Sequence, residues 1–245
     1  MIPKIVHYCW FGRGKKSSLI KKCIDSWHKY LPDWEFMEWN EDNYDFSKSK
    51  YAYDAYSQRK WAFVADYARF DVLNQYGGVY FDTDVELLKP IPCEILEQEA
   101  FTGFQSNNRV APGLVFGAEK GQPGLKKMLN VYQNWKFEII EGVKPPNILD
   151  AFNEAFLPDG LTLNGKFQIV DGIAIYPNAF FCCYDFETLT MEIKPETVSV
   201  HYFAASWMPK KQKIKQMFIR SAVKILGPKR YKQMKRLLLG ERNVR

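Results

Sequence analysis

The stretch from residue 61 to residue 84 constrains the fold most, because a helical pattern passes through two glycines directly into a short strand. Apolar residues recur at helical spacing over 61–76, and Gly77 stands where helices commonly end. Gly78 then leads into residues 79–81, a β-branched and aromatic run typical of a buried strand. A helix that feeds a buried strand is a building unit of α/β proteins.

The first forty residues show the same alternation. Residues 5–10 form a β-branched and aromatic run, residues 16–30 carry apolar side chains at four-residue steps, and residues 34–39 alternate like a strand. This order predicts strand, helix and strand, with Pro32 ending the helix. Later segments extend the pattern, with strands expected within 100–118 and over 173–176, and helices over 123–140 and 148–156. We therefore expect an α/β fold.

Charge is distributed unevenly along the chain. The net charge is +6, but residues 208–245 hold thirteen Lys or Arg against the single acid Glu241. These residues therefore carry +12, which leaves −6 for residues 1–207. An acidic body with a basic end is not the pattern of a nucleic-acid binder, whose positive charge is usually spread over a folded face. We expect no nucleic-acid partner.

The basic end has a periodicity of its own. Apolar residues recur at three- and four-residue steps over 214–225 and again over 231–238, with Gly227-Pro228 between the two runs. This spacing predicts two basic amphipathic helices, which are typical of proteins that lie on anionic membrane surfaces. A helix packed on the body of the protein, or a solvated end, would have the same pattern.

Other features bear on the compartment. No apolar run approaches the roughly 20 residues needed to cross a bilayer, and residues 5–11 are too short and too irregular for a signal peptide. The five cysteines are an odd number and lack the spacing of a zinc site. We therefore expect a reduced, cytoplasmic protein.

Asp82 and Asp84 follow the predicted strand and are two residues apart. If the chain stays extended there, both carboxylates project to the same side. Two carboxylates at one point favour a divalent cation such as Mg²⁺ or Mn²⁺. A cation with open positions can clamp a diphosphate and neutralise the charge that grows on it. An isolated Asp-x-Asp, by contrast, is typical of a surface turn.

The preceding helix carries a second charged pair. Asp66 and Arg69 are three apart and share one face, although their neighbours on the helix are nearly all apolar. A charged pair on a buried helix costs desolvation unless something compensates it. The pair is either a simple ion pair of the helix or a binding pair, with Asp66 accepting sugar hydroxyls and Arg69 facing the sugar or phosphate of a donor.

Four ordered segments together resemble glycosyltransferase family 32. They are residues 2–12, residues 39–41, the block from Asp66 to Asp84, and residues 201–207. The resemblance covers residues 1–207 and leaves 208–245 as a separate helical tail. It implies a GT-A-like, Rossmann-related fold with a mixed central sheet that binds a nucleotide-sugar donor, a UDP- or GDP-sugar. It also implies Mn²⁺ or Mg²⁺ and retention of the anomeric configuration.

The resemblance also implies roles for individual residues. Trp10 would stack on the base, although core packing would equally explain a Trp, and Asn40 would touch the base. Asp66 and Arg69 would meet the donor sugar. Asp82 and Asp84 would bind ribose and metal, with Asp84 the direct ligand. A late segment would close over the diphosphate: His201 completing the metal sphere, and Ser206 and Trp207 donating to phosphate oxygens.

The activity that we expect is transfer of a sugar to a carbohydrate or lipid-linked oligosaccharide acceptor in surface polysaccharide synthesis. Asp66, Arg69, Asp82, Asp84 and Trp207 would form the catalytic set. The protein would work at the inner face of the cell membrane, held by its tail. Two alternatives stay open. A metal-dependent nucleotide-sugar hydrolase would use the same donor site, with water in place of the acceptor. A non-catalytic carbohydrate- or nucleic-acid-binding module would need only the aromatic residues and the basic tail.

Overall fold

The computed structural model is a mixed α/β protein, and it describes residues 1–141, 143, 145–204 and 210–239. In this part of the chain, the largest sheet has eight strands in the order β2-β1-β3-β7-β5-β9-β8, with β6 paired to β5. Its strands are β1 (Ile5–Cys9), β2 (Glu35–Trp39), β3 (Gly78–Tyr80), β5 (Ala100–Ser106), β6 (Arg109–Val110), β7 (Phe116–Ala118), β8 (Gln168–Val170) and β9 (Ile173–Tyr176). The mixed central sheet expected from the sequence is confirmed.

The sheet contains both parallel and antiparallel pairs of strands. β1 lies between β2 and β3 and is parallel to both, whereas β7 is antiparallel to β3 and β5. The carboxyl ends of β1, β2 and β3 therefore meet at one edge. Two smaller pairs lie outside the sheet: β4 (Val85–Leu87) with β12 (Ser199–His201), and β10 (Tyr184–Asp185) with β11 (Thr190–Met191).

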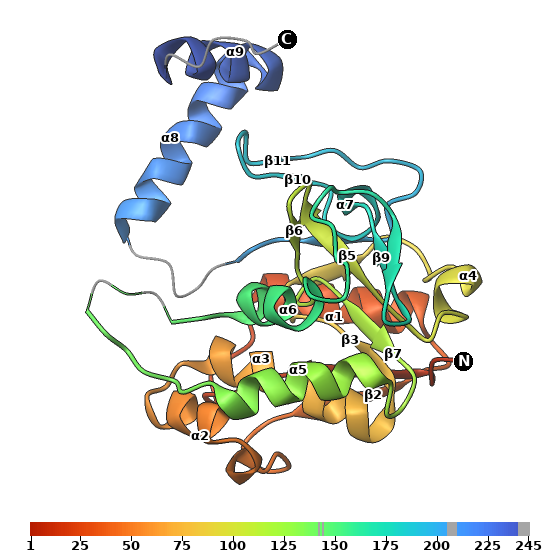
Figure 1. Cartoon of the computed structure of the whole chain (residues 1–245). Coiled ribbons are helices and arrows are strands. Elements are labelled where there is room, and N and C mark those ends of the chain that lie inside the picture. The colour runs from red at the N-terminus through yellow and green to blue at the C-terminus, as the bar shows by residue number, and fades with distance from the viewer. Residues whose placement is uncertain (142, 144, 205–209, 240–245) are drawn as a thin grey trace.

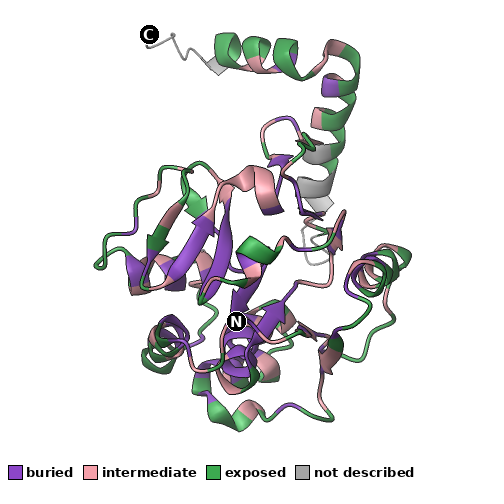
Figure 2. Cartoon of the chain, turned by 90° about the vertical axis from the view of Figure 1, so that its right-hand side faces the viewer, coloured by how far each residue is buried: buried purple, intermediate pink, exposed green. Residues whose placement is uncertain are grey.

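Helices cover both faces of the sheet (Figure 1). On one face lie α2 (Lys50–Ser57), α3 (Trp61–Tyr76), α5 (Pro123–Asn134) and α6 (Ile148–Phe156), with a 3₁₀ turn η1 (Phe46–Lys48) before them. On the other lie α1 (Ser18–Tyr30), α4 (Cys93–Leu96) and α7 (Asn178–Phe181). Strand residues alternate between the two apolar cores, and Figure 2 shows the sheet buried between its helices.

The join between α3 and β3 depends on its two glycines. Gly77 has a φ of 68° and ends the helix, donating from its N–H to the carbonyl of Leu73 at 2.7 Å. Gly78 has a φ of 107°, and a Cβ there would lie 2.5 Å from the carbonyl oxygen of Ile5. Only glycine suits a left-handed φ this close to neighbouring backbone. The predicted helix stop is confirmed, and the strand begins one residue earlier than expected.

His7 belongs to the core. It lies on β1 with its side chain fully buried, donates from Nε2 to the carbonyl of Gly77 at 2.8 Å and accepts at Nδ1 from Trp39 at 3.1 Å. Burial lowers the pKa of His7 to about 4, although the bond to Gly77 opposes the shift. The neutral imidazole therefore cross-links β1, β2 and the end of α3.

The helix predicted over 123–140 is wrong beyond residue 134. Trp135 adopts an extended conformation, with φ −86° and ψ 147°. Phe137 then turns back into the core, where its ring packs against that of Tyr51 at 5.4 Å. An aromatic anchor in the core thus overrides helical spacing. The helix predicted over 148–156 is confirmed, begun by a capping box of Asn147 and Asp150.

The two basic helices predicted near the C-terminus are present as α8 (Lys210–Leu226) and α9 (Pro228–Leu239). α8 leads away from the body, and α9 is tied to the β10–β11 hairpin by the ion pairs Lys232–Asp185, at 2.5 Å, and Lys235–Glu187, at 3.4 Å. In the described part of the chain, no helix is long and apolar enough to cross a membrane.

Candidate functional site

α3 positions the first charged pair. Residues 66 and 69 lie one turn apart, and Arg69 donates from Nη2 to Oδ1 of Asp66 at 2.8 Å. The middle of this helix, residues 66–73, is buried, because α2 and α5 pack on the face that the sheet leaves free. The Arg69 side chain is only 3% exposed and that of Asp66 12%. The ion pair therefore lies inside the protein, at the edge of the site.

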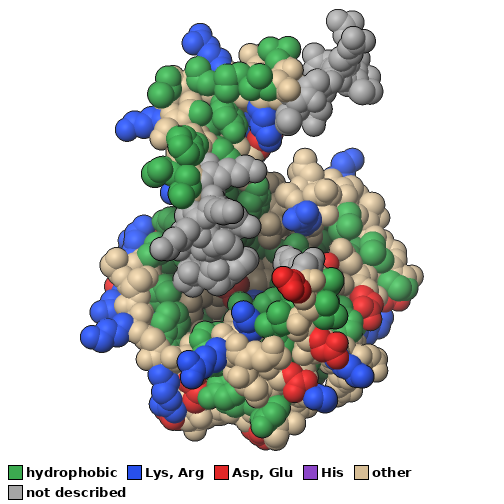
Figure 3. Space-filling view, turned by 90° about the vertical axis from the view of Figure 1, so that its left-hand side faces the viewer, with side chains coloured by type: hydrophobic (Ala, Val, Ile, Leu, Met, Phe, Trp, Pro, Cys, Tyr) green, Lys and Arg blue, Asp and Glu red, His purple; other side chains and the backbone are tan. Residues whose placement is uncertain are grey.

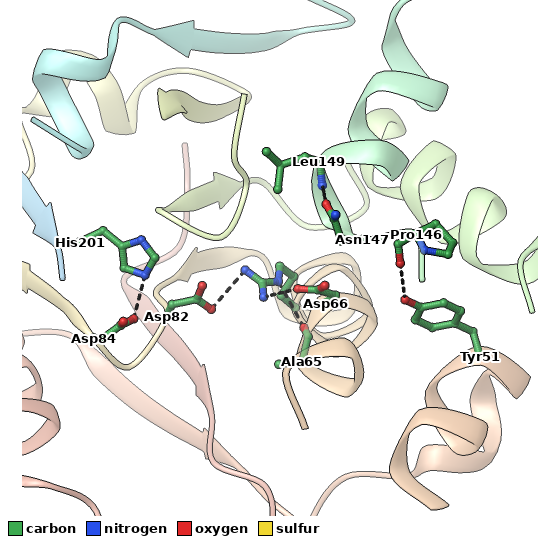
Figure 4. A network of polar contacts seen from close by, with 10 residues as sticks. Tyr51, Ala65, Asp66, Asp82, Asp84, Pro146, Asn147, Leu149 and His201 are labelled. Atoms are coloured by element: carbon green, nitrogen blue, oxygen red, sulfur yellow. Dashed lines mark hydrogen bonds and ion pairs between the residues drawn. The ribbon is translucent and has the colours of Figure 1, made fainter. Parts of the chain in front are cut away.

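Arg69 also joins α3 to the segment after β3. Its Nη1 lies 3.2 Å from Oδ1 of Asp82, and its guanidinium lies 4.7 Å from the centre of the Tyr80 ring. The contact with Asp82 is not aligned as a hydrogen bond, so Nη1 is buried without a hydrogen-bond partner. Arg69 is thus a buried bridge between two carboxylates (Figure 4). It neutralises both, since either alone would be costly to bury.

The chain turns sharply between Asp82 and Asp84. β3 ends at Tyr80, and the N–H of Val85 donates to the carbonyl of Asp82 at 3.0 Å, which closes a turn before β4. The extended conformation assumed for the Asp-x-Asp pair therefore does not persist. The turn nevertheless keeps both carboxylates in one site, and Figure 4 shows Asp82 between Asp66 and the pair formed by Asp84 and His201.

β12 brings His201 to Asp84 across 117 residues of sequence. β4 and β12 are antiparallel, with His201 opposite Val85, and the N–H of Tyr202 donates to the carbonyl of Asp84 at 3.0 Å. The imidazole Nε2 then lies 2.8 Å from Oδ1 of Asp84. The other carboxylate oxygen, Oδ2, accepts from the N–H of Ala204 at 2.8 Å. Asp84 thus holds the segment that follows β12.

The electrostatics of the three titratable groups differ. Burial raises the pKa of Asp82, against the opposing charges of Arg69 and His201. Burial also opposes ionisation of Asp84, but the charge and hydrogen bond of His201 outweigh it and lower the pKa of that carboxyl. The pKa of His201 is raised, because Asp84 outweighs the effect of burial. Asp84 and His201 therefore favour an ion pair.

Asp82, Asp84 and His201 offer two carboxylates and an imidazole to a divalent cation. In the described part of the chain, no group of three or more His, Cys, Asp or Glu residues forms a ready-made metal cage. Carboxylates nonetheless suit Mg²⁺ and Mn²⁺, which are commonly held by one or two of them together with substrate phosphates. Nδ1 of His201 is buried without a hydrogen-bond partner, so the imidazole has an unused nitrogen. The donor set fits a cation whose coordination the substrate completes.

A pocket of about 510 Å³ opens beyond β1 and β2. Trp10 and Asn40 line it together with Lys15, Lys16 and Lys21. Trp10 is half-buried and donates from its ring N–H to the carbonyl of Gly14 at 2.7 Å, so it is not a core residue. Asn40 accepts at its side-chain oxygen from the N–H of Asp42 at 2.8 Å, the ordinary bond of an Asn in a turn. The structure thus brings both predicted base-contacting residues to one pocket, whose lining also includes the acidic residues Glu38, Glu41 and Asp42.

The pocket and the acidic residues share one edge of the sheet. Cys9 is level with Trp39 on β2, and His7 is level with Tyr80 on β3, so Asp82 stands beyond β3 much as Trp10 stands beyond β1. Neighbouring strands are about 4.8 Å apart, which puts the two ends of the site on the order of 10 Å from each other. Ligands of α/β sheets commonly bind at this carboxyl edge.

Two predicted site residues, Ser206 and Trp207, lie outside the described residues. Their proposed closure over a diphosphate therefore stays a prediction. The described chain reaches Ala204, which is held at Asp84.

Sequence reasoning missed two neighbours of the acidic residues. The Tyr80 ring lies under the guanidinium of Arg69, and Gly113 lies against both Asp82 and Arg69. An aromatic residue in a strand and a Pro-Gly turn are visible in the sequence. Neither pattern says what the residue faces in the folded protein.

Residues 17–102 match a family described as "Glycosyltransferase sugar-binding region containing DXD motif". The segment includes α1, α3 and both acidic residues of the turn after β3. The match covers about a third of the chain. The resemblance drawn from the sequence motifs is confirmed here, and the DXD motif is Asp82-Thr83-Asp84.

Curated relatives of this DXD-motif region are yeast proteins. "Inositol phosphoceramide mannosyltransferase 3" of Schizosaccharomyces pombe is 28% identical over 145 residues, which are 56% of this chain and 38% of that protein. "Mannosyl phosphorylinositol ceramide synthase CSH1" of Saccharomyces cerevisiae is 31% identical over 149 residues, 56% of this chain and 36% of that protein. The alignments thus span little more than a third of these relatives.

Solved glycosyltransferase structures superpose partly on this chain. "PaToxG Glycosyltransferase" superposes with a TM-score of 0.48 at 18% identity, covering 63% of this chain and 68% of that one. The galactosyltransferase LgtC, solved with donor and acceptor sugar analogues, superposes with a TM-score of 0.46 at 11% identity, covering 89% of this chain and 94% of that one.

Proposed function

We propose that this protein is a retaining glycosyltransferase that moves a sugar from a nucleotide-diphosphate donor to a lipid-linked acceptor. The observation that carries the proposal is the single sheet edge at which the pocket lined by Trp10 and Asn40 adjoins the cluster of Asp82, Asp84 and His201. A nucleoside fits the pocket, and a diphosphate reaches from it toward the cluster. The match of residues 17–102 to the DXD family supports the same chemistry.

The chain's own residues bind and orient the donor. Trp10 offers a ring face to the base, and Lys15 and Lys21 offer positive charge to the phosphates, whereas Lys16 is paired with Glu38 at 2.8 Å. Asp84 and His201, with Asp82 beside them, are the residues that would hold Mn²⁺ or Mg²⁺. The cation would neutralise charge on the departing diphosphate. Asp82, the more exposed of the two carboxylates, also lies within reach of ribose hydroxyls.

Retention is what the family resemblance implies, and the engagement of the carboxylates bears on how it would be achieved. A two-step reaction needs a carboxylate free to attack the anomeric carbon. Asp66 and Asp82 are paired with Arg69, and Asp84 is bonded to His201 and Ala204. We therefore favour attack by the acceptor hydroxyl on the face that the diphosphate leaves. The acceptor oxygen bonds to the anomeric carbon, the bond to phosphate breaks, and the hydroxyl proton passes to a phosphate oxygen.

The acceptor is proposed to be carried on a lipid. Both yeast relatives are named for reactions on an inositol phosphate attached to ceramide. For this chain we propose a lipid-linked oligosaccharide of surface polysaccharide synthesis. A nucleotide-sugar hydrolase would use the same donor site, and it would release free sugar in place of a glycoside. A non-catalytic binding module would give no role to the buried ion pairs of Arg69 with Asp66 and Asp82.

A ligand panel tests the proposal. Purified full-length protein is heated with UDP- and GDP-sugars, each with and without Mn²⁺. We expect one nucleotide to raise Tm only when Mn²⁺ is present, since a ligand at 100 times its Kd stabilises the folded state by about 2.7 kcal/mol. Product analysis with an acceptor then separates glycoside from free sugar. If no nucleotide sugar shifts Tm under either condition, the proposed function is wrong.

We also propose that the protein is cytoplasmic and lies at the inner face of the cell membrane through α8 and α9. Several apolar side chains of these helices are at least half exposed: Ile214, Met217, Phe218, Ile225, Leu237 and Leu238. Figure 3 shows apolar and basic side chains together on this projecting part. Apolar residues among Lys and Arg suit an anionic lipid surface, where each basic residue contributes about 1 kcal/mol.

Vesicle sedimentation of the full-length protein tests the membrane proposal. The Phe218→Ser/Leu237→Ser variant is expected to bind vesicles of phosphatidylcholine and phosphatidylglycerol at least about tenfold more weakly, since burying each such side chain contributes about 1.5–3 kcal/mol. The control is Ile193→Ser, which replaces an equally exposed apolar residue on the body. Equal sedimentation of all three proteins, or binding that ignores lipid charge, would contradict the membrane role.

A further inference from the structure

Gly113 lies in the turn between β6 and β7, against the two groups that matter most in the site. A Cβ at this position would stand 2.8 Å from Oδ2 of Asp82 and 3.0 Å from Nη1 of Arg69. The turn is buried on all sides. Both distances are shorter than ordinary contacts to a methyl group, so no side chain fits there without displacing one of these atoms.

The backbone does not require glycine at residue 113. Its φ lies outside the left-handed region, unlike that of Gly77 or Gly78, so an alanine would not be strained there. The atoms that a methyl group would meet are the far ends of two side chains and not backbone. The missing side chain at Gly113 therefore makes room for the side chains of Asp82 and Arg69, and the backbone of the turn does not need it.

The two side chains differ in their freedom to move. Arg69 is 3% exposed and held at Nη2 by Asp66, whereas the Asp82 side chain is 28% exposed. A methyl group at residue 113 would therefore displace Asp82 more readily than Arg69. The carboxylate would turn toward the open side of the site, where the donor and its cation bind in the proposed function.

We propose that Gly113 is a positioning residue that acts through Asp82: its missing side chain lets the turn hold Asp82 against Arg69 in the orientation that receives a metal-bound nucleotide sugar. The proposal rests on the function proposed above. It makes the turn of residues 111–114 part of the wall of the donor-binding site, at Asp82.

Mn²⁺ binding, measured without and with UDP or GDP, tests this proposal. The change is Gly113→Ala, and the matched control is Gly103→Ala, where a Cβ would stand 2.8 Å from Cδ2 of Phe181 and would meet neither Asp82 nor Arg69. Residues that orient metal-site groups typically contribute about 10–100-fold to metal affinity. We expect Gly113→Ala to weaken Mn²⁺ binding, measured by electron paramagnetic resonance of the free ion, by at least about tenfold. Gly103→Ala should bind as the unchanged protein does.

A double variant separates positioning from a general loss of fold. In an Asp82→Ala background the methyl group meets no carboxylate, so adding Gly113→Ala should not weaken Mn²⁺ binding further and should cost less stability than it does alone. If the unchanged protein binds no Mn²⁺ even with UDP or GDP present, the proposed function fails and with it the reason for this role. If it binds Mn²⁺ while Gly113→Ala matches Gly103→Ala, or if the two changes are additive, the role of Gly113 is wrong.

Discussion

The Asp84→Asn protein is expected to transfer sugar about a thousandfold more slowly than the unchanged protein, because a carboxylate that helps to hold the cation contributes several kcal/mol to the stability of the transition state. Asparagine has nearly the same shape and retains one oxygen acceptor for the Ala204 N–H. Asp84→Ala would remove the bonds to both His201 and Ala204, so its loss of activity would combine chemistry with loss of the segment after β12. The measurement is initial rate at saturating Mn²⁺ and donor.

Asp33→Asn is the control for Asp84→Asn. Asp33 pairs with Lys4 in solvent, with its side chain 62% exposed, at the opposite end of β2 from the site. Its replacement should leave the rate of transfer unchanged, because an exposed ion pair contributes little. Full Mn²⁺-dependent activity in the Asp84→Asn protein would refute the assignment of Asp84 to the reaction centre.

The Arg69→Ala protein is expected to lose about 3–5 kcal/mol of its free energy of unfolding, because removing one partner leaves buried charge uncompensated. Arg69 neutralises Asp66 and Asp82 at the same time, with distances of 2.8 and 3.2 Å. Arg69→Lys keeps the charge but not the two-branched guanidinium, so it should recover part of the stability and little of the activity. Urea unfolding measures the first quantity and initial rates measure the second.

A second ion pair of the same kind is the control for Arg69→Ala. Lys50 and Asp54 are four apart on α2 and 2.8 Å from each other, but the Lys50 side chain is 76% exposed. Lys50→Ala should therefore change the free energy of unfolding by no more than about 0.5 kcal/mol. If Arg69→Ala lowers the free energy of unfolding no more than Lys50→Ala does, the conclusion that Arg69 neutralises two buried carboxylates is wrong.

Local patterns predicted the parts of the fold that depend on neighbouring residues. The helix over 61–76, the glycine pair after it and the basic helices near the C-terminus are confirmed, since each follows from residues a few positions apart. The helix predicted over 123–140 was too long, because its end was decided by Phe137 entering the core and not by helical spacing. Periodicity does not contain that information.

The sequence by itself determined that two acids follow a buried strand and that a charged pair lies one helical turn apart before it. Only the tertiary structure decided that β12 sets His201 beside Asp84, that Arg69 lies buried between Asp66 and Asp82, and that Gly113 leaves room for both. The physical reason is the sequence separation over which each kind of interaction acts. Helix spacing and turn chemistry act over a few residues, whereas strand pairing joins groups 117 residues apart and is specified by the packing of the whole sheet.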